Sequence, residues 1–301
     1  MKYAITGASG HISKPLALQL LAAGHEVTVI GRSAKNLQEL TDKGAKAAIG
    51  SVEDIAFLTR TFEGKDAVYL MAPPNFAVPD MKEFIHSTGK NYAAAVKAAG
   101  VKHVVNLSSV GAHLDAGVGP VVGLHRTEQE LNKLEGVNVL HLRPSYFYYN
   151  LFANLDLIRN MNIAGSNFTA AAGTFPIVHT SDIAAVAAEA MLGLNFKGHS
   201  HVYIASDEVG TDQIAAALGN AVGKPGVVWV QFPDEQAFQG MLHAGLPENI
   251  ASNYVEMGNA IQSGIMLEDY FKQPNRKLGK IKLQDFAVEF AAAYNAAAPT
   301  A

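Results

Sequence analysis

The chain has 301 residues, of which 49% are hydrophobic, and its formal net charge is −4. This length and apolar content predict one large α/β domain with an extension and a substantial buried core. The sequence contains no cysteine, which excludes disulfides, thiolate catalysis and cysteine-ligated metal sites. The small net charge favours neither nucleic acid nor an anionic membrane as a partner.

The first half of the chain alternates between strand-like and helical patterns. Strands are predicted at 2–6, 26–31, 45–50, 66–72, 101–109 and 137–145, and helices at 13–24, 33–44, 54–64, 81–100 and 125–136. Repeated βα units indicate a parallel sheet with helices on both faces. We therefore expect a doubly wound α/β fold of the Rossmann type, with ligands bound outside the carboxyl ends of the strands.

The alternation weakens from about residue 151. Helices are predicted at 181–192 and 211–223, short strands at 201–206 and 226–232, and an irregular helical region at 246–266, while the alanine-rich end at 291–301 is expected to fray. We expect residues 1–150 to form a dinucleotide-binding domain whose sheet is completed by later strands. Residues 151–301 would form a smaller lobe that binds the substrate.

Two features of the sequence argue against export and membrane insertion. Residues 2–6 read as a strand, which leaves no room for a signal peptide. The most apolar later stretch, IAAVAAEAMLGL, is short and contains Glu189, whereas a membrane-spanning helix needs about 20 predominantly apolar residues. We expect a soluble, cytoplasmic protein that is a monomer or a homodimer.

The stretch TGASGHIS, directly after the first strand, has the spacing of a dinucleotide-binding turn. Gly7 permits the tight turn, Gly10 lets the backbone approach a pyrophosphate, and Ser13 replaces the third glycine, which mainly serves close packing. The predicted cofactor-binding residues of this stretch are Gly7, Ser9, Gly10, His11 and Ile12. An ordinary strand–turn–helix is the alternative interpretation.

The second strand ends in IGRS, where a cofactor with a free ribose 2′-hydroxyl would meet Asp or Glu. The sequence offers Arg32 and Ser33 instead, with Lys35 nearby. A guanidinium suits a 2′-phosphate, so this pattern favours NADPH over NADH. A solvated loop arginine is the alternative.

The ends of the later strands supply further candidates. Ala72 and Pro73 are expected beside the nicotinamide ribose, and Pro74 in the substrate pocket. Ser51 and Val52 are expected beside the adenine. Asp54, in the same loop, is equally well explained as a helix N-cap. Ser108 and Ser109 are expected either to face the cofactor or to cap the next segment of the chain.

The motifs TGASGHIS, IGRS, LSSVGA, LRPSYFYYN and FPIVHTSDIAAVAAEAM occur in this order. In this respect the chain resembles the NmrA-like group of atypical short-chain dehydrogenases/reductases, and within it the triphenylmethane reductase and NADPH-dependent quinone oxidoreductase subgroup. The resemblance covers nearly the whole chain. It implies a Rossmann domain, NADP(H) as cofactor, and hydride transfer to a quinone-like or dye-like small-molecule acceptor.

The chain departs from the wider superfamily in lacking its Tyr-x-x-x-Lys pair. His125 stands eighteen residues before Arg143, as a histidine does in the quinone-reductase subgroup, and either binds the nicotinamide ribose, donates a proton or is structural. Tyr146 is a second catalytic candidate. A flat acceptor is expected to stack on Tyr146, Phe147 and Tyr148.

Three other polar residues have simpler interpretations. Asp182 is expected to cap a helix rather than to do chemistry. His199 and His201 have no nearby carboxylate or third histidine and are interpreted as a surface loop, not a metal site.

Two other functions stay open beside the reductase. One is a non-catalytic NADP(H)-binding redox sensor that docks a partner protein. The other is a reductase or isomerase of another small metabolite.

Overall fold

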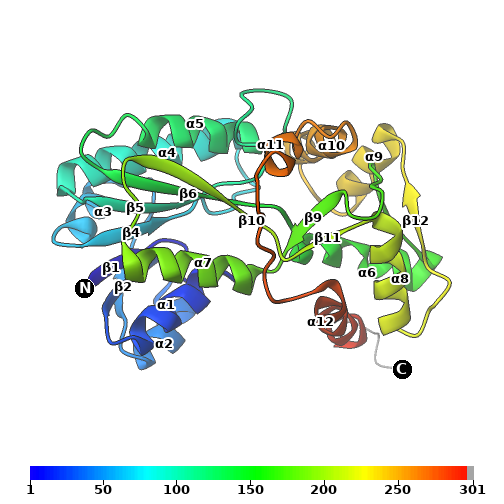
Figure 1. Cartoon of the computed structure of the whole chain (residues 1–301), viewed down its shortest axis with the longest axis horizontal. Coiled ribbons are helices and arrows are strands. Elements are labelled where there is room, and N and C mark those ends of the chain that lie inside the picture. The colour runs from blue at the N-terminus through cyan, green and yellow to red at the C-terminus, as the bar shows by residue number, and fades with distance from the viewer. Residues whose placement is uncertain (297–301) are drawn as a thin grey trace.

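The computed structural model describes residues 1–296, and its centre is a seven-stranded parallel sheet. The strands are β1 (Lys2–Ile5), β2 (Glu26–Gly31), β3 (Lys46–Ile49), β4 (Ala67–Leu70), β5 (His103–Leu107), β6 (Asn138–Pro144) and β10 (His199–Ile204). Their spatial order is β10-β6-β5-β4-β1-β2-β3 (Figure 1). The chain first moves outward from β1 to β3 and then outward from β4 to β10, so the topological switch point lies between β1 and β4.

Helices cover both faces of this sheet. The helices α1 (Ser13–Ala22), α2 (Ala34–Asp42) and α7 (Thr180–Gly193) share one core cluster with the sheet, and α3 (Ile55–Phe62), α4 (Met81–Ala99) and α5 (Val121–Leu131) share another on the opposite face. Figure 1 shows the two helical layers on either side of the strands. The predicted doubly wound Rossmann-type fold is confirmed.

A second lobe follows the sixth strand of the sheet and lies at one end of the molecule (Figure 1). It contains two small sheets, β11-β9-β7 and β12-β8, and its own apolar core. Its elements are β7 (Tyr146–Phe147), the 3₁₀ helix η1 (Tyr148–Asn154), α6 (Leu155–Met161), β8 (Ile163–Ser166), β9 (Phe175–Val178), β11 (Asp207–Val209), α8 (Thr211–Ala221), β12 (Val228–Gln231), α9 (Asp234–His243), α10 (Glu248–Gln262), α11 (Glu268–Phe271) and α12 (Leu283–Ala296).

Several details differ from the sequence-based expectations. His199 and His201 do not lie in a surface loop but on β10, the edge strand of the main sheet, where both are exposed. Of the alanine-rich end that was expected to fray, residues 291–296 continue helix α12, and residues 297–301 lie outside the described part of the chain. Within residues 1–296, no helix is both long and apolar enough to cross a membrane.

The role of Asp182 also differs from the predicted helix cap. The N-cap of α7 is His179, whose Nδ1 accepts the N–H of Ser181 at 3.1 Å. Asp182, in the first turn, instead accepts the backbone N–H groups of Lys280 and Ile281, both at 3.1 Å. This carboxylate therefore holds the segment before α12 against the cofactor domain.

Candidate cofactor and acceptor site

The glycine loop joins β1 to α1 beside the switch point of the sheet. Gly7 has φ +61°, and a Cβ added to it would lie 2.3 Å from Sδ of Met71. The N–H of Gly10 donates to the carbonyl oxygen of Gly7 at 2.9 Å and closes the turn. The N–H of Ala8 donates to the carbonyl oxygen of Ile30 at 3.2 Å, which fixes the loop to β2. The left-handed backbone and the close contact with Met71 both require glycine at position 7.

The start of helix α1 presents unsatisfied backbone donors. Among the described residues, no acceptor takes the N–H groups of His11, Ile12 and Ser13. Free donors and the positive end of a ten-residue helix form a site that suits a pyrophosphate. Ser13 is only 2% exposed, which agrees with a packing role for the position of the third glycine.

The end of β2 carries a cation, Arg32, that has no ion-pair partner among residues 1–296. Arg32 and Lys35 are both exposed. Lys14 of α1 is ion-paired with Glu39 of α2, whereas Arg32 forms no ion pair in the part of the chain that the structure describes. The guanidinium of Arg32 is therefore free to bind an anion next to the glycine loop.

The loop after β3 resolves one of the open alternatives. Asp54 accepts the N–H of Phe57 at 2.9 Å and is the N-cap of α3, as one interpretation predicted. The Ser51 hydroxyl accepts the N–H of Glu53 at 3.1 Å, and the N–H of Gly50 donates to the carbonyl oxygen of Gly31 at 3.1 Å. Ser51 and Arg32 thus follow strands that are joined at their carboxyl ends.

The loop after β4 lies on the other side of the switch point and is pinned at its first residue. The N–H of Met71 donates to Oγ1 of Thr6 at 2.9 Å, and the carbonyl oxygen of Met71 accepts the hydroxyl of Tyr92 at 2.7 Å. Ala72 and Pro73 are half-buried, and Pro74 is exposed. The stretch that was predicted to flank the nicotinamide ribose therefore starts from a fixed backbone position.

Ser108, at the end of β5, belongs to a buried polar network. Its hydroxyl donates to Oε1 of Glu128 at 2.5 Å, and Glu128 is bound by Arg143 through contacts of 2.6 and 3.0 Å. Burial alone would raise the pKa of Glu128, but Arg143 and the nearby His141 hold that pKa below its usual range. The hydroxyl of Ser108 is thus engaged by Glu128. A contact between Ser108 and the cofactor stays a prediction only for the backbone of this residue.

His125 lies on α5 and is half-buried. Its Nδ1 is 2.9 Å from the carbonyl oxygen of Ala112. Because a carbonyl oxygen only accepts, Nδ1 carries the proton and Nε2 of the neutral ring is an acceptor. Nε2 is thus the ring nitrogen left for a ligand, and both functional roles that the sequence left open stay predictions.

The aromatic run after β6 is divided between different environments. Tyr148 is fully buried and stacks on Phe286, with ring centroids 5.0 Å apart and an interplanar angle of 10°. The prediction that Tyr148 lines the substrate pocket is therefore wrong, because its ring is enclosed in the core of the second lobe. Tyr146 is half-buried against that same core, whereas Phe147 packs against the core of the cofactor domain. Of the three aromatic residues, Tyr146 stays the candidate for contact with an acceptor.

Two residues at this edge lie in segments that the sequence associates with the acceptor but were not singled out as site residues. Tyr149 is 45% exposed and packs against His11 with the rings tilted by 37° and their centroids 4.3 Å apart, which joins the glycine loop to the second lobe. Tyr254 of α10 packs in a small apolar cluster that we call the seam cluster. This cluster has a buried centre of Met81, Ile85 and Ile250 and a half-buried rim of Ala72, Phe84, Leu124, Leu246 and Tyr254. No local pattern in the sequence distinguishes Tyr254, because its partners lie on α4, on α5 and after β4.

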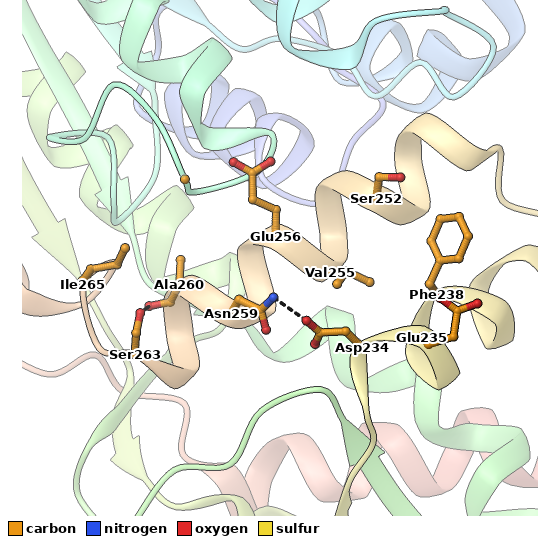
Figure 2. A pocket seen from close by; sticks show the side chains of 11 residues that line it. Asp234, Glu235, Phe238, Ser252, Val255, Glu256, Asn259, Ala260, Ser263 and Ile265 are labelled. Atoms are coloured by element: carbon orange, nitrogen blue, oxygen red, sulfur yellow. Dashed lines mark hydrogen bonds between the residues drawn. The ribbon is translucent and has the colours of Figure 1, made fainter.

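A cavity of about 690 Å³ lies elsewhere, between α9, α10 and the loop at Gly117 (Figure 2). Its lining includes Asp234, whose carboxylate accepts the amide of Asn259 at 2.6 Å (Figure 2). None of the residues that line it is a predicted cofactor or substrate residue. Within residues 1–296, no group of three or more His, Asp or Glu side chains has an arrangement that could hold a metal ion.

Comparisons with known proteins agree with the fold. An NAD(P)H azoreductase from Xenophilus azovorans is 27% identical to the chain over 253 residues, which are 84% of this chain and 85% of that protein. The Citrobacter sp. triphenylmethane reductase, solved with NADP(H), superposes with a TM-score of 0.76 at 20% identity, covering 96% of this chain and 99% of that one. The NADPH-dependent quinone oxidoreductase QOR2 from Escherichia coli, solved with NADPH, gives a TM-score of 0.74 at 19% identity and covers 95% and 99%. The pattern of the NmrA-like family matches residues 2–287, and the chain belongs to this family.

Proposed function

We propose that the chain is an NADPH-dependent oxidoreductase that reduces a quinone-like or other flat conjugated acceptor. This proposal rests on two neighbouring features at the switch point of the Rossmann-type sheet. Among the residues that the structure describes, the N–H donors at the start of α1 are free and Arg32 beside them is unpaired. The names of the relatives, which are NAD(P)H-dependent reductases, support the same class of reaction.

Each part of the cofactor would meet a residue of matching chemistry. The pyrophosphate would bind the N–H groups after Gly10, and the 2′-phosphate would bind Arg32. The nicotinamide ribose would lie against Ala72 and Pro73, with Nε2 of His125 accepting one of its hydroxyls. When bound there, NADPH would supply the hydride.

The choice of acceptor follows from the missing proton relay. No tyrosine in the sequence is followed four positions later by lysine. Burial raises the pKa of Tyr146, with a further contribution from Tyr254, so this phenol is a poor proton donor. A simple ketone becomes an alkoxide that needs prompt protonation, whereas quinones and conjugated cations delocalise the added charge. Holding the acceptor in a reactive geometry can then provide most of the rate.

Stopped-flow oxidation of bound NADPH by a panel of quinones, cationic dyes and simple ketones tests this function. We expect rapid oxidation with quinones or other conjugated acceptors and slow oxidation with ketones. Fast ketone reduction would contradict the proposed chemistry. Tight NADPH binding without reduction of any acceptor would instead support the redox sensor.

A further inference from the structure

Helix α10 of the second lobe brings a tyrosine to the carboxyl ends of the strands. Tyr254 packs against the seam cluster, and so do Ala72 and Leu124. Ala72 follows β4 by two residues, and Leu124 directly precedes His125 on α5. Tyr254 therefore lies near the loop that is expected to flank the nicotinamide ribose.

The part of α10 around Tyr254 is firmly seated on the cofactor domain. Nζ of Lys82 on α4 is 2.6 Å from Oε2 of Glu256, and the amide of Asn249 donates to the carbonyl oxygen of Val78 at 2.9 Å. A Cβ added to Gly119, just before α5, would lie 2.1 Å from the backbone oxygen of Asn253. These contacts on both sides of position 254 fix the backbone that carries the ring.

The hydroxyl of Tyr254 is available to a ligand. The side chain is half-buried, and within residues 1–296 its hydroxyl neither forms a hydrogen bond nor is sealed in the interior. Burial raises the pKa of Tyr254, so the group stays a neutral donor at physiological pH. Burial raises the pKa of Tyr146, and Tyr254 raises it further.

We infer that Tyr254 donates a hydrogen bond to a carbonyl oxygen of the acceptor, and that the site therefore selects neutral quinones over cationic triarylmethane dyes, whose central carbon carries no oxygen. This inference rests on the proposed function. In the reaction, the quinone gains a hydride from NADPH and one proton from water and leaves as the hydroquinone, while NADP⁺ is formed. The two added electrons build negative charge on the carbonyl oxygen, and a donor aimed at that oxygen binds it more strongly as the charge grows.

The variant Tyr254→Phe tests this role because it keeps the ring in the seam cluster and removes only the donor. A single donor in a fully enclosed oxyanion site is worth about a hundredfold to a thousandfold in kcat. For a half-buried hydroxyl we expect kcat/KM for a benzoquinone to fall by roughly tenfold to a hundredfold, and kcat/KM for a cationic triarylmethane dye to change by less than about threefold. The matched control is Tyr294→Phe on α12, whose ring lies 4.7 Å from the guanidinium of Arg159 in the second lobe. We expect both substrates to react with the control as with the wild type.

A second measurement needs no turnover. Binding of the hydroquinone to the NADPH-loaded protein, measured by calorimetry, should weaken several-fold in Tyr254→Phe, while the affinity for NADPH itself should be unchanged. An equal loss for quinone and dye, an unchanged quinone rate, or a wild type that prefers the dye would each overturn the inference and leave the reductase function intact. A wild type that binds NADPH but reduces neither acceptor would overturn the proposed function as well.

Discussion

At the scale of single residues, Arg32 is the side chain on which the cofactor preference depends. It is exposed beside the glycine loop and has no ion-pair partner among the described residues. Arg32→Asp should weaken NADPH binding by about 1.5–3 kcal/mol, because charge-assisted hydrogen bonds to the 2′-phosphate are lost, and should relatively favour NADH. Fluorescence titration with both cofactors measures this shift, with Arg60→Asp in the last turn of α3 as a control. Equal affinities for the two cofactors in both wild type and variant would show that Arg32 does not recognise the 2′-phosphate.

Gly7 allows a prediction with a closely matched control. Gly7 and Gly100 both have positive φ, +61° and +70°, but an added Cβ meets Met71 only at position 7 and has open space at position 100. Alanine should cost about 1–2 kcal/mol of backbone strain at either site. Only at position 7 must a neighbouring side chain, that of Met71, also move, and it moves at the turn that is predicted to receive the pyrophosphate. We expect calorimetry to show at least tenfold weaker NADPH binding for Gly7→Ala and wild-type binding for Gly100→Ala, whereas equal affinities would argue against the tight turn as a requirement.

Single residues also show where local sequence stops being informative. Asp54 and Asp182 stand near predicted helix starts, and the capping pattern fits both. Asp54 is a cap because its carboxylate accepts the backbone N–H of Phe57, three residues later in the chain. Asp182 is not, because its partners, Lys280 and Ile281, come from 98 and 99 residues further on. A contact of that sequence separation leaves no mark in the local pattern.

At the scale of elements, strand β6 carries a histidine whose environment predicts a pH effect on stability. Nε2 of His141 is 3.0 Å from Oδ1 of Asn132, and its Nδ1 is 3.1 Å from the amide nitrogen of Asn106. The ring therefore donates through Nε2 and accepts through Nδ1, which leaves no acceptor for a second proton. Burial, with a smaller contribution from the charge of Arg143, lowers the pKa of His141 to about 4.

The sign of the effect follows from linkage between folding and protonation. Below about pH 6.5 His141 binds a proton in the unfolded chain but stays neutral in the folded chain. The free energy of unfolding therefore falls as the pH drops from about 6.5 to 4. We expect a loss of about 1.6 kcal/mol in the free energy of unfolding between pH 6.5 and pH 5, measured by urea denaturation. His141→Gln, which does not titrate, should remove this part of the slope. The same slope in the variant and the wild type would show that His141 is not its source.

At the scale of the whole molecule, the sequence predicted the parallel sheet and its completion by later strands, but not which later elements join it. The first six strands and the helices between them follow from short-range periodicity and chain order. Helix α7 and strand β10 were predicted as elements, yet they belong to the cofactor domain although they lie after residue 150. Their placement depends on the pairing of β10 with β6 and on the packing of α7 beside α1, which are long-range contacts.

This arrangement predicts that residues 1–150 do not fold on their own. The fragment lacks β10, which pairs with β6, and α7, whose Ile183, Ala184 and Ala187 are fully buried in the same core cluster as Leu16 and Leu20 of α1. Without α7 one face of the sheet exposes apolar side chains to water, so we expect weak near-ultraviolet circular dichroism, strong binding of a hydrophobic dye and no measurable NADPH binding. A fragment of residues 1–206 restores both elements and should regain NADPH binding, because the glycine loop, Arg32 and the loop after β4 then rest on a complete sheet. If the shorter fragment bound NADPH as tightly as the full chain, the division at residue 150 would describe an independent domain, and α7 would contribute only to the attachment of the second lobe.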